Sequence, residues 1–217
     1  MRICCISDTH GEHWNIKLLP EAEMLIHAGD LCLRGSIEEL DKATAWLQAL
    51  REKYELVISI AGNHDWPLVR EPDLAQRMMR DRGITYLQDS GLHYKGLHFW
   101  GSPWTPTFFN WAFMLPRSGS EIAEKWKMIP DNTDVLITHG PPYGILDPGL
   151  QAANVGCEAL VRRVTELPNL KLNVFGHLHE GHGIHKWIDP KHPTTFVNAS
   201  LLNDSYRPVY QPIVVEI

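Results

Sequence analysis

Five short polar segments, each placed directly after an apolar run, constrain the fold of this chain more than any other feature. The apolar runs are short and rich in Ile, Val and Leu, which is typical of buried β-strands. The segments are Asp8-Thr9-His10, Gly29-Asp30, Gly62-Asn63-His64-Asp65, Thr138-His139-Gly140-Pro141-Pro142 and Gly176-His177-Leu178-His179. Because the carboxyl ends of neighbouring strands meet at one edge of a sheet, we expect these five segments to converge.

The pattern between these segments predicts a βαβ first half and a β-rich second half. Ser36 precedes Glu39 at the spacing of a capping box, and the apolar residues that follow repeat at helical intervals. Short strands with Gly turns after Ile84 predict an antiparallel β portion. The expected strands are 2–7, 24–28, 55–61, 84–87, 92–94, 97–100, 134–138, 170–175, 184–188, 195–198 and 213–217, and the expected helices are 36–52, 71–82, 120–128 and 156–167. The segment 101–113 is rich in Pro and aromatic residues and is predicted to be a long ordered loop.

Composition limits the class of protein. A chain of 217 residues without a Ser/Gly-rich linker or charge block is expected to form one domain over 1–217. Its longest apolar runs fall well short of the ~20 residues that cross a bilayer, so we expect no membrane span. The short apolar start and four cysteines without CxxC spacing favour a reduced, cytoplasmic protein. The net charge of −6 argues against a nucleic-acid polymer as partner.

The five segments carry the donors that a pair of metal ions needs. Divalent metals bind oxygen and nitrogen donors, and one carboxylate shared by two ions holds them roughly 3.5 to 4 Å apart. The candidate ligands are Asp8, His10, Asp30, Asn63, His139, His177 and His179, with Asp30 in the shared position. The set has no cysteine, which disfavours a structural zinc site. Only two of its members are anionic, so two bound cations leave a net positive charge that attracts phosphate.

These motifs together resemble the calcineurin-like metallophosphoesterase superfamily. Within it, four further stretches resemble the MPPED-type subfamily, which is grouped with class III cyclic nucleotide phosphodiesterases. They are Gly101-Ser102-Pro103-Trp104-Thr105-Pro106, Leu115-Pro116-Arg117, Thr138-His139-Gly140-Pro141-Pro142 and His179-Glu180-Gly181. The resemblance implies an α/β four-layer sandwich, in which two mixed β-sheets are flanked by helices and the dimetal site lies at the strand ends.

The resemblance also divides the ligands between two ions. By motif position, Asp8, His10, Asp30 and His179 hold one metal, and Asp30, Asn63, His139 and His177 hold the other. The two ions would be divalent or trivalent transition metals, and nitrogen and oxygen ligands leave Mn, Fe and Zn open.

The chemistry expected of such a centre is hydrolysis. A hydroxide that bridges the metals attacks the phosphorus in line with the leaving oxygen. The family motif places His64 beside the metals, where it would protonate the leaving group as general acid. For Asp65 two interpretations are open: it orients the ring of His64, or it caps a turn.

The aromatic loop allows two interpretations as well. Its side chains could form a wall on which a nucleobase stacks, or they could pack over the open end of the sandwich. The candidates for substrate binding are Trp104, Phe109, Trp111 and Arg117. Arg117 would contact phosphate or pair with a surface acid.

We therefore expect a phosphodiesterase for small phosphodiesters, with 2′,3′- or 3′,5′-cyclic nucleotides as the leading candidates. A phosphomonoesterase on the same centre is the first alternative, and a nuclease ranks last because it would need a basic groove. A non-catalytic scaffold on the same fold is an alternative of another class. The sequence leaves the oligomeric state open between a monomer and a homodimer.

Overall fold

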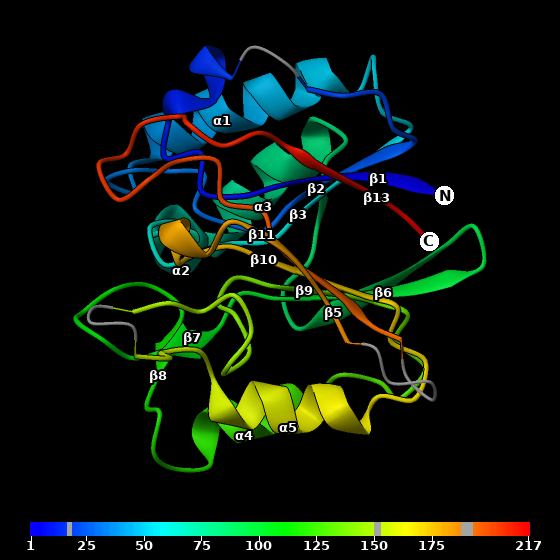
Figure 1. The fold of residues 1–217 in the computed structure, drawn as a ribbon. Helices are drawn as coiled ribbons and strands as arrows, with labels where there is room; N and C mark the ends of the chain where they lie inside the picture. Colours follow the sequence, from blue (N-terminus) through cyan, green and yellow to red (C-terminus); the bar gives the residue numbers. More distant parts are fainter. Residues whose placement is uncertain (17–18, 150–152, 188–192) are drawn as a thin grey trace.

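The computed structural model describes residues 1–16, 19–149, 153–187 and 193–217. Two β-sheets pack face to face, and helices cover the outer face of each, so that the chain forms four layers (Figure 1). The helices are η1 (Glu12–Asn15), α1 (Ile37–Leu50), α2 (Pro67–Arg70), α3 (Pro72–Asp81), α4 (Glu121–Lys127), α5 (Glu158–Glu166) and η3 (His179–Gly181). The expected fold class, two mixed sheets flanked by helices, is confirmed.

The first sheet has the strand order β13-β1-β2-β3-β4. Its strands are β1 (Arg2–Ile6), β2 (Met24–His27), β3 (Leu56–Ser59), β4 (Thr85–Tyr86) and β13 (Ile213–Glu216). β1 to β4 run parallel, and only β13 is antiparallel to its neighbour β1. The carboxyl ends of β1, β2 and β3 therefore lie side by side, which places three of the polar segments together.

The second sheet has the order β11-β12-β10-β9-β6-β5. Its strands are β5 (Ser90–Tyr94), β6 (Leu97–Ser102), β9 (Val135–Thr138), β10 (Leu172–Phe175), β11 (Gly183–Lys186) and β12 (Thr195–Asn198). The four central strands are parallel, and β5 and β11 are antiparallel edges. A separate small pair, β7 (Thr105–Pro106) and β8 (Met114–Leu115), closes the base of the aromatic loop.

Two expectations about strands are corrected by this topology. The predicted antiparallel portion after Ile84 is wrong for most of the sheet, because α4 and α5 provide crossovers that return the chain parallel to β6 and β9. Residues 84–87 do not start the second sheet either, since β4 pairs in parallel with β3. Of the strand expected over 184–188, Ile188 lies outside the described residues.

Alternation along the strands builds the three cores of the sandwich. In β1, Cys4 and Ile6 face the layer of α1 and α3, whereas Ile3 and Cys5 face the second sheet. On the far side, Leu136 and Phe175 pack with α4 and α5. Successive side chains of a strand point to opposite faces, so a central strand that is covered on both faces must be apolar throughout.

The N-terminal end of α1 follows directly from the sequence. The Ser36 hydroxyl accepts a hydrogen bond from the Glu39 N–H, and the Glu39 carboxylate accepts one from the Ser36 N–H. This confirms the predicted capping box. The cysteines Cys4, Cys5, Cys32 and Cys157 are all free and buried, as expected. Within the described residues, the helices are too short or too polar to cross a bilayer.

His13 is a buried histidine whose two ring nitrogens lack hydrogen-bond partners. It packs between Trp14 and Trp46, and burial lowers its pKa to about 4. In the folded chain His13 therefore takes up a proton only near pH 4, whereas in the unfolded chain it does so near its ordinary pKa of about 6.5. Protonation of the unfolded chain alone lowers the free energy of unfolding. His13 therefore leaves stability unaffected above about pH 6.5 and reduces it as the pH falls toward 4.

We expect His13→Leu to reduce this acid destabilisation by about 2 kcal/mol at pH 4.5 and to leave stability at pH 8 equal or higher. Urea unfolding at the two pH values measures the effect. His185→Gln provides the matched control, because His185 lies on an exposed strand. A gain of the same size at both pH values would show that His13 acts through packing and not through its proton.

Candidate metal centre

The predicted ligands come together at the edge where the strands of both sheets end. Asp8 follows β1, Asp30 follows β2 and Asn63 follows β3. From the second sheet, His139 follows β9 and His177 follows β10. His179 opens the short helix η3, and its side chain reaches the first sheet's ligands. Three overlapping groups of donors in the described residues have their ligand atoms within 4.8 Å of one another.

Asp8, His10 and His179 form one of these groups, and Asp30 lies next to it. The Nε2 atom of His10 lies 3.8 Å from Asp8 Oδ1, 3.6 Å from Asp30 Oδ2 and 3.3 Å from His179 Nε2. His179 Nε2 lies 3.6 Å from Asp8 Oδ1. These are the residues that the motif positions assigned to one ion.

Asp30, His139 and His177 form a second group, and Asn63 lies next to it. His139 Nε2 lies 2.9 Å from Asn63 Oδ1 and 3.3 Å from Asp30 Oδ2. The ring of His177 is centred 5.0 Å from that of His139, and its donor atom belongs to the same group as those of Asp30 and His139. Asp30 Oδ2 therefore faces both groups, as a carboxylate shared by two ions must.

Hydrogen bonds from the surrounding backbone fix which atoms face the centre. The Nδ1 atoms of His10, His139 and His179 bond to the carbonyl oxygens of Cys32, Ala28 and Asn203 at 3.0, 2.9 and 3.0 Å. A carbonyl only accepts, so each Nδ1 carries the hydrogen and each neutral ring turns a lone pair on Nε2 inward.

The two carboxylates are fixed in the same manner. Asp8 Oδ2 accepts hydrogen bonds from the Ser200 hydroxyl at 2.8 Å and the His177 N–H at 2.9 Å. Asp30 Oδ1 accepts one from the His64 N–H at 2.8 Å. In each case the second oxygen is left to face the imidazole nitrogens.

This donor set fits metal ions. Imidazole lone pairs, two carboxylate oxygens and an amide oxygen meet within a few ångströms, and acceptors alone cannot satisfy one another. The centre therefore requires positive charge. In the protein without metal, protons supply it: Asp30 raises the pKa of His139 to about 9 and Asp8 raises that of His179 to about 9, against the opposing effect of burial. Burial instead lowers the pKa of His10 to about 4.

Binding of metal must displace the protons on His139 and His179. We expect metal affinity to rise with pH up to about 9, because below this value the ion competes with protons for both Nε2 atoms. Titration calorimetry in buffers of different ionisation enthalpy should give a release of about two protons per chain at pH 7.5. An enthalpy that does not depend on the buffer would contradict this assignment of protons.

The backbone around the centre is unusual, which supports a functional site. Asp8, His10, Asp30 and His177 all adopt a positive φ, at 53°, 41°, 58° and 69°. Residues other than glycine adopt this region at a cost, and such residues concentrate at functional sites. Gly176 has a different role, because a Cβ at this position would collide with the Asp8 carboxylate. The glycine therefore allows β10 to bring His177 onto Asp8.

His64 lies beside both groups, and its Nε2 atom is the ring nitrogen that could take part in proton transfer. Its Nδ1 bonds to the carbonyl of Leu33 at 2.6 Å, so Nδ1 carries the hydrogen and Nε2 is available. The ring stacks on Trp111 at 4.3 Å and meets the edge of His10 at 4.6 Å. By distance alone it could also be a ligand, since it forms the third donor group with His10 and Asp30.

The expectation that Asp65 orients the His64 ring is wrong. Its two oxygens accept hydrogen bonds from the backbone N–H groups of Asp30, Leu31, Cys32 and Gly62, at 3.0, 3.3, 2.9 and 2.8 Å. The side chain is fully buried. Asp65 thus joins the turn after β2 to the turn after β3, and the turn-capping alternative holds. Its effect on the centre is to position Asp30.

Two of the four substrate-binding candidates have other partners. Arg117 donates to Glu158 and to the Gly156 carbonyl at 2.7 Å each, so it pairs with a surface acid. Trp104 donates to Asp89 at 2.9 Å and packs against Phe113 and Lys125. These contacts favour the packing interpretation for Trp104 and the pairing of Arg117 with a surface acid.

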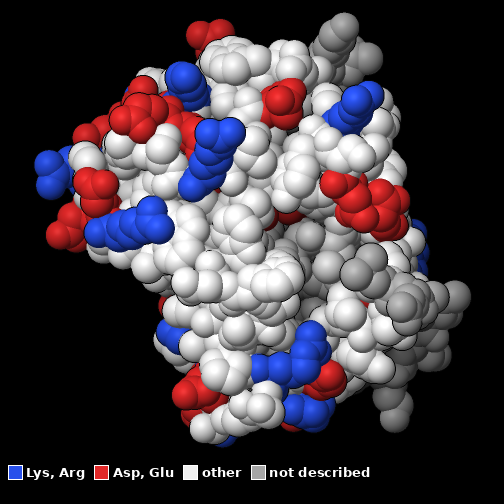
Figure 2. Space-filling model, turned by 90° about the vertical axis from the view of Figure 1, so that its left-hand side faces the viewer, with Lys and Arg blue, Asp and Glu red and all other residues white. Residues whose placement is uncertain are grey.

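The other two candidates remain in reach of a substrate. Trp111 stacks on His64 and therefore borders the centre. Phe109 is 80% exposed and touches Phe108, whose ring is centred 5.3 Å from His177. Seen from the side where the strands end, the middle of this face carries few Lys or Arg side chains (Figure 2).

Sequence reasoning missed Tyr206 as a neighbour of the centre. Ser200 donates to Asp8, and Tyr206 lies against His10 and His179. Both come after β12, beyond the last motif, and no local pattern linked Tyr206 to the ligands. The Ser7–Ser200 bridge between the sheets is the feature that brings this segment to the centre.

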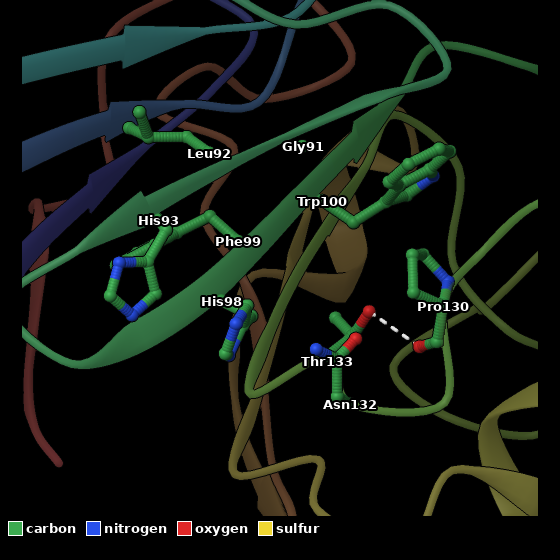
Figure 3. Close-up of a pocket in the computed structure, with 9 residues that line it drawn as sticks. All are labelled: Gly91, Leu92, His93, His98, Phe99, Trp100, Pro130, Asn132 and Thr133. Atoms are coloured by element: carbon green, nitrogen blue, oxygen red, sulfur yellow. Dashed lines mark hydrogen bonds between the residues drawn. The ribbon is translucent and has the colours of Figure 1, made fainter.

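A cavity elsewhere in the molecule does not belong to this centre. It has a volume of about 170 Å³ and lies between the β5–β6 hairpin and the 130–133 turn (Figure 3). Its lining includes His93, His98 and Trp100, and none of the predicted ligands.

A two-sheet sandwich with histidine and aspartate donors gathered at its strand ends defines a metallophosphoesterase. A family model described as calcineurin-like phosphoesterase matches residues 1–181. The chain belongs to this family, whose members use divalent metals to hydrolyse phosphoesters.

Related proteins agree with this assignment. Metallophosphoesterase domain-containing protein 1 of Homo sapiens is 37% identical over all of this chain and 71% of its own length. UPF0046 protein K07C11.7 of Caenorhabditis elegans is 35% identical over all of this chain and 75% of its own. The crystal structure of TT1561 of Thermus thermophilus shares the fold, with a TM-score of 0.63 over 91% of this chain and 88% of that one, at 14% identity.

Proposed function

We propose that the protein is a dinuclear metal phosphodiesterase for small phosphodiesters, with cyclic nucleotides as the leading substrate class. The observation that carries the proposal is the position of Asp30 Oδ2, 3.6 Å from His10 Nε2 and 3.3 Å from His139 Nε2. One carboxylate oxygen between two sets of inward lone pairs suits a pair of ions. When bound, the ions supply Lewis acidity and an activated water.

The remaining steps belong to the chain's own residues. Backbone carbonyls hold the Nε2 atoms of His10, His139 and His179 toward the centre. The Nδ1 atom of His64 donates to the Leu33 carbonyl, so Nε2 is the ring nitrogen that would carry the proton to the leaving oxygen. Stacking on Trp111 keeps that ring in place. Asp65 fixes the turn that presents Asp30.

A small substrate agrees with the surface around the centre. A polynucleotide would need a path of Lys and Arg for its phosphates, whereas the middle of this face has few (Figure 2). Trp111 and the exposed Phe108 and Phe109 offer flat apolar surface for a base. The four free cysteines favour the reducing cytoplasm as the protein's location.

Hydrolysis of bis-p-nitrophenyl phosphate and p-nitrophenyl phosphate separates the diesterase from the phosphomonoesterase. The protein, loaded with Mn²⁺, Fe²⁺ or Zn²⁺, is expected to act on the diester at least about tenfold faster, and chelation should abolish the activity. 2′,3′- and 3′,5′-cyclic AMP then test the nucleotide class. Faster action on the monoester would favour the alternative enzyme, and two bound ions without hydrolysis of either ester would favour a scaffold.

A further inference from the structure

Tyr206 lies over one half of the metal centre, although it comes 27 positions after the last predicted ligand, His179. Its ring is centred 4.9 Å from that of His10 and 5.5 Å from that of His179. The plane of the tyrosine ring is nearly perpendicular to the planes of both imidazole rings. The side chain is 41% exposed, so the ring is held between the histidines and solvent.

The loop that carries Tyr206 is tied to the centre through Asn203. The Asn203 carbonyl accepts the Nδ1 hydrogen of His179 at 3.0 Å and the Tyr206 N–H at 2.8 Å. The Asn203 side-chain oxygen accepts the N–H groups of Ser205 and Arg207, at 3.1 Å each. Tyr206 itself has a φ of 55°. One residue thus fixes both the direction of a predicted ligand and the position of the tyrosine.

Tyr206 also borders His64, with ring centroids 6.3 Å apart. Trp111 stacks on the same histidine at 4.3 Å. Phe108, by contrast, lies against His177 in the other half of the centre. The aromatic side chains therefore divide into a Tyr206–Trp111 pair at His64 and Phe108 at His177.

A group that receives a proton from His64 must lie in contact with this histidine. The substituent on the leaving oxygen then extends past His64 toward solvent, where Tyr206 and Trp111 border it. Both rings offer flat apolar surface, which favours an aromatic or planar substituent over a small alkyl one.

We propose that Tyr206 is a specificity-determining residue that, together with Trp111, forms the subsite for the leaving group of the phosphodiester. The proposal rests on the proposed function, in which His64 protonates that leaving group. It assigns to the segment after β12 a contact with substrate that the aromatic loop alone was expected to provide.

Methyl phenyl phosphate and methyl hexafluoroisopropyl phosphate test the proposal, because their leaving groups have similar acidity and only one contains a ring. We expect Tyr206→Ala to lower the ratio of kcat/KM for the phenyl ester to that for the fluoroalkyl ester by about 3- to 10-fold, which is typical of one lost aromatic contact. Tyr206→Phe should keep the wild-type ratio, since the ring remains. Tyr206→Leu, which keeps apolar bulk without a ring, should lower it.

Val209→Ala is the matched control, because Val209 lies in the same loop and is 51% exposed. Alanine and tyrosine meet the same backbone restriction at positive φ, so Tyr206→Ala adds no strain, and metal content and thermal unfolding check that the centre is intact. An unchanged ratio in Tyr206→Ala, with active wild-type protein, overturns the role of Tyr206 alone. Wild-type protein that binds two ions and hydrolyses neither ester overturns the proposed function.

Discussion

Asp30→Asn is expected to lower the metal content of the protein from two ions per chain to one or fewer and to reduce diester hydrolysis about a thousandfold or more. Asp30 Oδ1 accepts the His64 N–H at 2.8 Å, and an asparagine oxygen can keep this bond. The amide NH₂ then replaces Oδ2, which faces Nε2 of His10 and of His139. An NH₂ group cannot bind a cation, and the lost stabilisation of phosphate charge amounts to several kcal/mol.

The measurement combines elemental analysis of the purified variant with bis-p-nitrophenyl phosphate turnover at saturating Mn²⁺. Asp134→Asn is the matched control, because Asp134 is a buried aspartate that accepts the His98 N–H away from the centre. It should keep both ions. If Asp30→Asn retains two ions and wild-type turnover, metal binding and hydrolysis do not depend on a carboxylate of Asp30 that the two ions share.

His64→Ala is expected to retain both ions and to lose about 100- to 10,000-fold in turnover of a diester with a poor alkoxide leaving group. The physical reason is the position of the ring: Nδ1 is committed to Leu33 and Nε2 is left for proton transfer. With p-nitrophenolate, which leaves without a proton, the loss should be less than about tenfold.

The two leaving groups and the metal content together separate the roles open to His64. His185→Ala, on an exposed strand, is the control and should be neutral with both substrates. If His64→Ala binds only one ion, His64 is a ligand, as its place beside His10 and Asp30 would permit. Equal losses with both leaving groups would also remove it from the role of general acid.

Most strands and helices and the attachment of the donors to strand ends could be predicted because each depends on local pattern. Short apolar runs set the strands, and the Ser36–Glu39 pair set the start of α1. The parallel direction of β6, β9 and β10 could not be predicted, since strand pairing depends on where α4 and α5 carry the chain. A Gly-turn pattern after residue 84 resembles hairpins whether or not the later strands pair that way.

The different contacts of the aromatic residues could not be predicted from local pattern either. Trp104 and Phe108 belong to one aromatic segment, yet one donates to Asp89 and the other borders His177. Composition gives both the same expectation, and only the path of the loop between β7 and β8 separates them.

The sequence by itself determined the kinds of donor, their order and their attachment to strand ends, because residue type and alternation are local properties. Only the tertiary structure decided that Asp65 binds backbone and not His64, that Arg117 pairs with Glu158, and that Tyr206 lies on His10. Those outcomes depend on which distant segments the two packed sheets bring into contact. A side chain selects among partners only after the backbone has placed them within hydrogen-bond or van der Waals reach.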